Sequence, residues 1–94
     1  MRSKKDVEAL VNLVVKMREK AMSAARRCSR DVIGHYEAYI TWSEKLVEAM
    51  RSAFAEGIIS KEEVSQYSAK DDRDEARSAV TTSIIKCGYR ARRV

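Results

Sequence analysis

The chain has 94 residues with no proline and three glycines; 45% of its residues are hydrophobic, 35% are charged, and the formal net charge is +5. This composition argues against a sheet protein or a disordered chain and favours a single all-α domain over residues 1–94. A domain of this size buries only a modest core, so its helices must match well or pair between subunits.

Apolar residues recur at alternating steps of three and four along two segments of similar length. The first series is Val7, Leu10, Val14, Met17, Ala21, Ala24 and Cys28, and the second is Ile33, Tyr36, Ile40, Ser43, Val47, Met50 and Phe54. Such spacing places each series on one stripe of a helix, and the neighbouring Val32, Tyr39, Leu46 and Ala53 widen the second stripe. It predicts two long helices, about 3–28 and 31–56, paired as an antiparallel hairpin.

The ends of these two helices carry local signals. Ser3 is a plausible N-cap with Asp6 at the third helical position, Asp31 can cap the second helix, and Gly57 can end it. The apolar side chains in the last turns of the first helix are small, whereas those in the facing first turns of the second helix are bulky. We therefore expect Tyr36 to contact the segment 21–25.

The C-terminal third carries two further helix starts. Ser60 followed by Glu63 forms a capping-box pattern, and Asp72 with Glu75 can cap a fresh helix that Gly88 then ends. The charged run between these two starts removes any apolar stripe. We therefore predict a C-terminal helical segment broken near 69–72, which completes a three- or four-helix bundle.

Two cysteines lie at helix ends in this scheme, Cys28 on the first apolar series and Cys87 near the end of the last helix. They could pair as a disulfide. The simpler interpretation is two buried, reduced thiols, because cysteine is among the most often buried residues.

Basic residues gather in two parts of the sequence. Residues 1–30 carry nine Lys and Arg against three acids, and residues 86–94 carry four against none, so 89–94 is a basic C-terminal tail. If the last helix runs parallel to the first, these parts form one patch, able to attract phosphate or an acidic partner. The alternative is that the charges only complement helix C-termini. The patch would consist of Arg26, Arg27, Arg30, Lys86, Tyr89, Arg90, Arg92 and Arg93.

Trp42 lies off the second apolar series and should face outward from the hairpin. It is either covered by a later helix or anchors a protein partner or second subunit, for which tryptophan is well suited. Thr41 and Lys45 would border it, and His35 lies seven residues earlier. These four residues form the predicted protein interface.

No catalytic constellation is visible. Cys28, Asp31 and His35 could offer three metal ligands, but a lone histidine beside a capping aspartate more often makes a local hydrogen bond. Neither cysteine has a general base at a recognisable spacing. We therefore expect no enzyme activity, no cofactor and no metal.

The sequence therefore favours a non-catalytic helical interaction protein, a regulator, inhibitor or assembly factor that self-associates as a homodimer. Its size would suit an accessory protein of a phage or other mobile element. The alternative is non-specific nucleic-acid binding through the arginine-rich end. No apolar run approaches the roughly 18 residues of a spanning helix, and polar residues interrupt the segment after Met1–Lys5, so we expect a cytoplasmic protein with no membrane partner.

Overall fold

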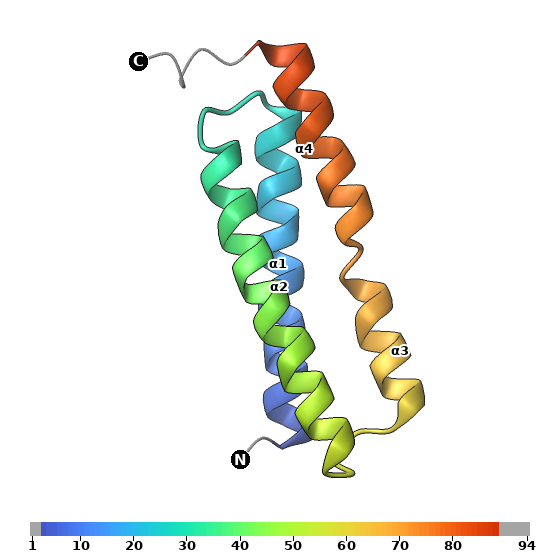
Figure 1. Cartoon of the computed structure of the whole chain (residues 1–94). Helices are drawn as coiled ribbons and strands as arrows, with labels where there is room; N and C mark the ends of the chain where they lie inside the picture. Colours follow the sequence, from blue (N-terminus) through green and yellow to red (C-terminus); the bar gives the residue numbers. More distant parts are fainter. Residues whose placement is uncertain (1–2, 89–94) are drawn as a thin grey trace.

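The computed structural model describes residues 3–88, which form four helices and no strand. They are α1 (Lys4–Arg26), α2 (Val32–Ala55), α3 (Lys61–Lys70) and α4 (Arg73–Cys87). Figure 1 shows α1 and α2 as a long antiparallel hairpin, with α3 and then α4 returning beside it. This confirms the predicted all-α bundle, with its long hairpin and its broken C-terminal segment. Within the part described, no helix has the length and apolar character needed to cross a membrane.

Most of the helix ends follow the local signals. Ser3 with Asp6 and Ser60 with Glu63 form complete capping boxes, with side chain and backbone bonded in both directions. The Asp72 carboxylate accepts from the Glu75 N–H, so α4 starts where predicted. Asp31 is the exception: it occupies the N-cap position of α2, but its side chain makes no capping hydrogen bond.

The hairpin buries part of the predicted series of α2 together with the positions predicted to widen it. Ile33 and Phe54, the ends of the predicted series, are 40% and 49% exposed. The positions predicted to widen the stripe are all buried, and so are two members of the series itself: Val32, Tyr39, Leu46 and Ala53, with Ser43 and Met50. The buried face is therefore centred closer to the widening positions, and the two end residues of the predicted series lie at its edge.

Packing at the closed end of the hairpin agrees with the predicted pairing of large and small residues. Tyr36 packs against a buried cluster of Ala24, Ala25, Val32 and Val80. The small alanines of α1 allow the two helices to approach closely, and the Tyr36 ring fills the adjoining space.

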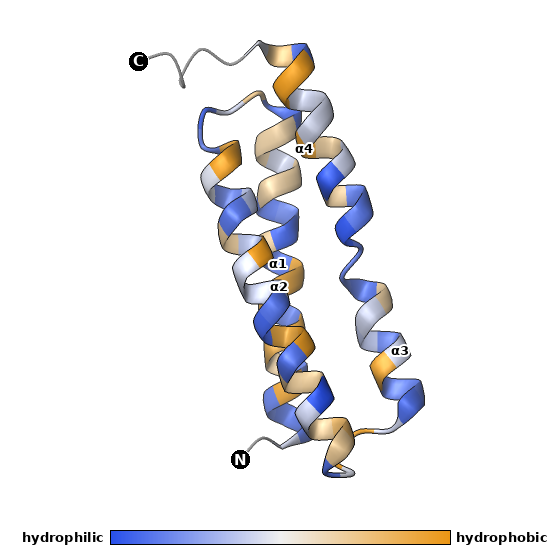
Figure 2. Cartoon of the chain, viewed as in Figure 1, coloured by the Kyte–Doolittle hydropathy of each residue, from blue (hydrophilic) through white to orange (hydrophobic). Residues whose placement is uncertain are grey.

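We call α3 and α4 together the third rod. Its polar bonds to α1 are spread along the length of the bundle: Lys4 pairs with Glu63, the Tyr67 hydroxyl donates to Glu8, and Arg18 pairs with Glu75. Figure 2 shows that hydrophilic residues dominate much of this rod. The largest fully buried side chains of the described residues all belong to α1 and α2. The third rod is therefore held by polar bonds and by a few buried apolar residues, of which Tyr67 is the largest.

Cys28 and Cys87 form a disulfide, so the expectation of two buried, reduced thiols was wrong. Cys28 is exposed rather than buried. It has φ 54°, and the bonds from the Cys28 N–H to Ala25 O and from the Ser29 N–H to Ala24 O define a Schellman motif at the end of α1. Glycine usually holds this left-handed position, as Gly57 does at the end of α2. The backbone of Cys28 is therefore strained, and its disulfide with Cys87 joins the end of α1 to α4.

We predict that two ways of removing the disulfide will have unequal costs. Cys87→Ala should lower the free energy of unfolding by about 4 kcal/mol, because the bond closes a long loop. Cys28→Gly also loses the bond, but it relieves the left-handed strain and should cost about 1 kcal/mol less. Urea unfolding of both variants and of the oxidised wild type measures the difference. Equal losses would contradict the strain at Cys28.

Candidate functional site

A shallow groove runs between α1 and α2 around Trp42. Trp42 is 36% exposed and Leu13, across from it on α1, is 39% exposed. No residue of α3 or α4 lines this groove. The later helices therefore do not cover Trp42 there, and the hairpin alone forms the surface. We call it the Trp42 groove; its residues are Asp6, Ala9, Leu10, Leu13, Trp42, Lys45 and Glu48.

Helix geometry explains why Trp42 faces this groove. Tyr39 and Leu46, three residues before and four after Trp42, are 0% and 1% exposed and lie in the hairpin interface. Trp42 sits on the same side of α2, displaced from these residues towards solvent. Its ring is therefore supported by the hairpin on one side and open on the other.

Charged groups of both signs line the Trp42 groove. The Lys45 ammonium lies 5.5 Å from the centroid of the Trp42 ring, within range of a cation–π interaction worth about 0.5–1 kcal/mol at an exposed site. Asp6 and Glu48 supply carboxylates to the same groove. The site is thus an apolar strip with a mixed-charge border.

The structure brings together only two of the four residues predicted at an interface. Trp42 and Lys45 both line the groove. Thr41 is exposed next to Trp42 in the chain, and His35 is half-buried about two turns earlier on α2, but neither lines the groove. Within residues 3–88 no group of three or more His, Cys, Asp and Glu side chains is placed to hold a metal ion.

The structure describes four of the eight residues predicted to form the basic patch. Arg26, Arg27, Arg30 and Lys86 are all exposed at one end of the bundle. The disulfide brings the Cα atoms of Cys28 and Cys87 within 5.6 Å, so α4 ends beside the end of α1. Arg26 and Lys86 line the same groove. The other predicted members lie outside the described residues: Tyr89, Arg90, Arg92 and Arg93.

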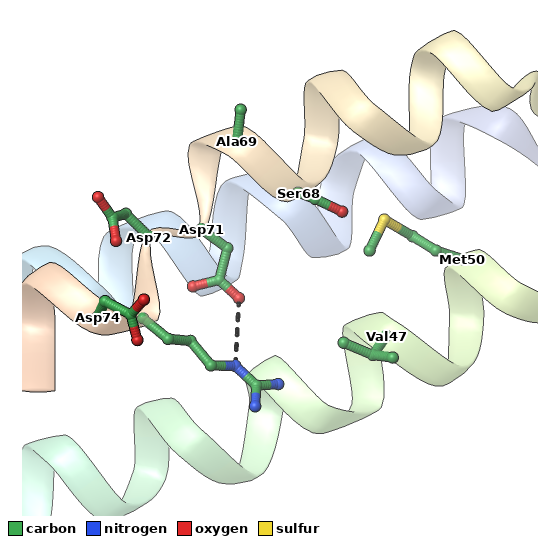
Figure 3. Close-up of a pocket in the computed structure, with 8 residues that line it drawn as sticks. Val47, Met50, Ser68, Ala69, Asp71, Asp72 and Asp74 are labelled. Carbon is green, nitrogen blue, oxygen red and sulfur yellow. Dashed lines mark ion pairs between the residues drawn. The ribbon is translucent and has the colours of Figure 1, made fainter.

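A buried polar network, which the sequence did not reveal, fixes the break between α3 and α4. Asp71 has a side chain only 7% exposed, and it accepts hydrogen bonds from the hydroxyls of Tyr39 and Ser43. The Arg73 Nε lies 3.9 Å from the Asp71 carboxylate and donates to Ser43 Oγ over 2.6 Å. Figure 3 shows the Asp71 carboxylate on the side of the break that faces α2. The arrangement compensates a buried charge, so its role is structural.

The sequence did carry a weak signal for this network. Tyr39 and Ser43 are one turn apart on α2 and thus share a face, and both are polar members of the predicted, widened apolar stripe. A carboxylate partner could have been sought in the acidic run around the predicted break. Which of its several acids turns inward depends on long-range packing.

We predict an alkaline dependence of stability that originates at Tyr39. Burial and the hydrogen bond to Asp71 raise the pKa of Tyr39 in the folded chain above its ordinary value of 10.0. The stabilisation is therefore complete below about pH 10 and is lost as the pH rises towards the folded-state pKa. Tyr39→Phe should cost about 1–3 kcal/mol at neutral pH and flatten the decline above pH 10.

The measurement is chemical unfolding from pH 7 to 11, with Tyr36→Phe as the control because Tyr36 is outside the network. An unchanged alkaline slope in Tyr39→Phe would contradict this assignment.

No protein-family model, curated protein or solved structure matches the chain.

Proposed function

We propose that this chain is a non-catalytic interaction protein, a regulator, inhibitor or assembly factor, that self-associates as a homodimer through the Trp42 groove. The observation that carries the proposal is an exposed tryptophan beside an exposed leucine on a hairpin face that the third rod leaves open. Tryptophan is enriched among the residues that contribute most to binding at protein interfaces.

The charges of the groove favour a second copy as the occupant. In a two-fold dimer the same surface of each subunit meets itself, so it must carry complementary groups. Lys45 provides a positive charge, and Asp6 and Glu48 provide negative charges, among the residues that line the groove. Lys45 of one copy can therefore face a carboxylate of the other while the Trp42 and Leu13 side chains pack together.

We also propose the cytoplasm as the location of the protein. Thiol reductants keep most cysteines reduced in that compartment, where disulfides are usually transient or regulatory. The Cys28–Cys87 bond would then be an exchangeable bond rather than a permanent cross-link.

Truncating Trp42 should weaken the dimer. Trp42→Ala is expected to cost about 2 kcal/mol of association free energy, roughly thirtyfold in Kd, because it removes the anchor from the groove. Phe54→Ala is the matched control, since Phe54 is a similarly exposed aromatic residue of α2 that does not line the groove. Sedimentation equilibrium over a range of concentrations measures both.

A monomeric wild type, or equal weakening by both variants, would overturn the proposed interface. A second test uses charge: Lys45→Glu should weaken the dimer, and adding Glu48→Lys should restore part of the loss. Failure of both charge variants to change the Kd would remove the argument from complementarity.

One observation favours a second candidate function, non-specific binding of nucleic acid. The disulfide brings Arg26 and Lys86 to one end of the bundle, and Arg27 and Arg30 are exposed nearby in the chain. Such a surface would bind the phosphate backbone with steep salt dependence.

Reversing three of these charges, in Arg26→Glu, Arg27→Glu and Lys86→Glu combined, should abolish binding to a duplex DNA of arbitrary sequence. If residual binding is measurable, the slope of log K against log salt should fall by up to about 3. The dimer should be unaffected, because none of these residues lines the Trp42 groove. Wild type that ignores DNA at low salt would exclude this second function.

A further inference from the structure

The disulfide borders a groove of its own at the basic end of the bundle. Cys28 is exposed and Cys87 is half-buried. Both line a groove between the end of α1 and the outer side of α4. We call it the disulfide groove; its residues are Ala25, Arg26, Cys28, Ala79, Thr82, Ser83, Lys86 and Cys87. A small molecule in this groove lies beside a reactive sulfur–sulfur bond.

All charged residues that line the disulfide groove are cations, Arg26 on α1 and Lys86 on α4. Arg27 and Arg30 are exposed on either side of Cys28 in the chain. Asp31 is the nearest acid in the sequence, and it does not line the groove. Clustered cations raise the local concentration of a small anion and stabilise a cysteine thiolate.

We propose that the disulfide groove receives a small anionic thiol of the glutathione class, which exchanges with the Cys28–Cys87 disulfide. This goes beyond the proposed self-association and does not depend on it. The thiol carries carboxylates that Arg26 and Lys86 attract, while its own thiolate is the nucleophile. The lining residues thus supply both the attraction and the reactive bond.

The exchange balances in two steps. A first thiolate attacks one cysteine sulfur, the protein S–S bond breaks, and a mixed disulfide forms while the other cysteine leaves as a thiolate. A second thiolate attacks the mixed disulfide, releasing the symmetrical disulfide of the small thiol and the second cysteine thiolate. Two small thiols are oxidised, the protein accepts two electrons, and the two cysteines take up the protons that the thiols gave up.

The structure also indicates what opening the bond would release. The buried residues of α4 are Ala76, Val80 and Ser83, all small or medium in size. Near the disulfide, Ile84 is only partly buried against the cluster around Val32. Once the bond opens, the covalent link between the ends of α1 and α4 is lost, so the last turns of α4 should separate more readily from α1.

The test compares two thiols on the oxidised full-length chain. The rate of disulfide opening is measured with glutathione and with neutral 2-mercaptoethanol. Each rate is then divided by the rate at which the same thiol opens a small neutral disulfide, which corrects for the different reactivities of the two thiols. In 20 mM salt the normalised rate should be about tenfold higher for glutathione, and 0.5 M salt should remove most of that preference. Arg26→Glu with Lys86→Glu should remove it as well.

The control variant, Lys61→Glu with Lys70→Glu, makes the same change in net charge on α3, outside the disulfide groove, and should keep the preference. Equal normalised rates for the two thiols in the wild type would overturn the proposal. Titration of two free thiols per chain in protein purified under oxidising conditions would also overturn the proposal.

Hydrogen exchange of the same samples tests the release of α4. Reduction should speed exchange in the last two turns of α4 while leaving the middle of α2 protected. Unchanged protection of α4 after reduction would show that opening the bond releases nothing, and would overturn that part of the proposal.

Discussion

The buried carboxylate of Asp71 is the constraint on which the arrangement of the third rod depends. A charge with a side chain 7% exposed requires partners, and it finds them in Tyr39 and Ser43 of α2 and in Arg73. The Arg18 side chain of α1 donates to the Asp72 carbonyl over 3.0 Å, so both hairpin helices hold the break. Together with the buried apolar residues of α3 and α4, this anchor holds them on one face of the hairpin.

The choice of face has two consequences for function. Successive residues of a helix point about 100° apart, so when Ser43 turns towards the third rod, Trp42 points to a different side and stays open. The same return path makes α4 parallel to α1, and the disulfide then joins their ends. The apolar groove and the basic end therefore both follow from how the third rod docks.

What the sequence could predict was decided by short-range signals. The two capping boxes, the turn at Gly57 and the break near residue 71 depend on residues within a few positions of one another. The buried face of α2 was predicted only in part, because Ile33 and Phe54 at the ends of the series are exposed. Its centre includes Tyr39, which bonds to Asp71, 32 residues away. The disulfide spans a separation of 59 residues, which no local pattern reports.

Trp42 is the only tryptophan of the chain, which makes it a direct optical probe of the central claim. The measurement is the emission maximum and acrylamide quenching of the wild type over a thousandfold dilution. If a second copy covers the Trp42 groove, dilution should shift the emission to the red and increase quenching along the same curve as dissociation of the dimer. Emission and quenching that stay constant while the protein dissociates would place the contact elsewhere and contradict this account.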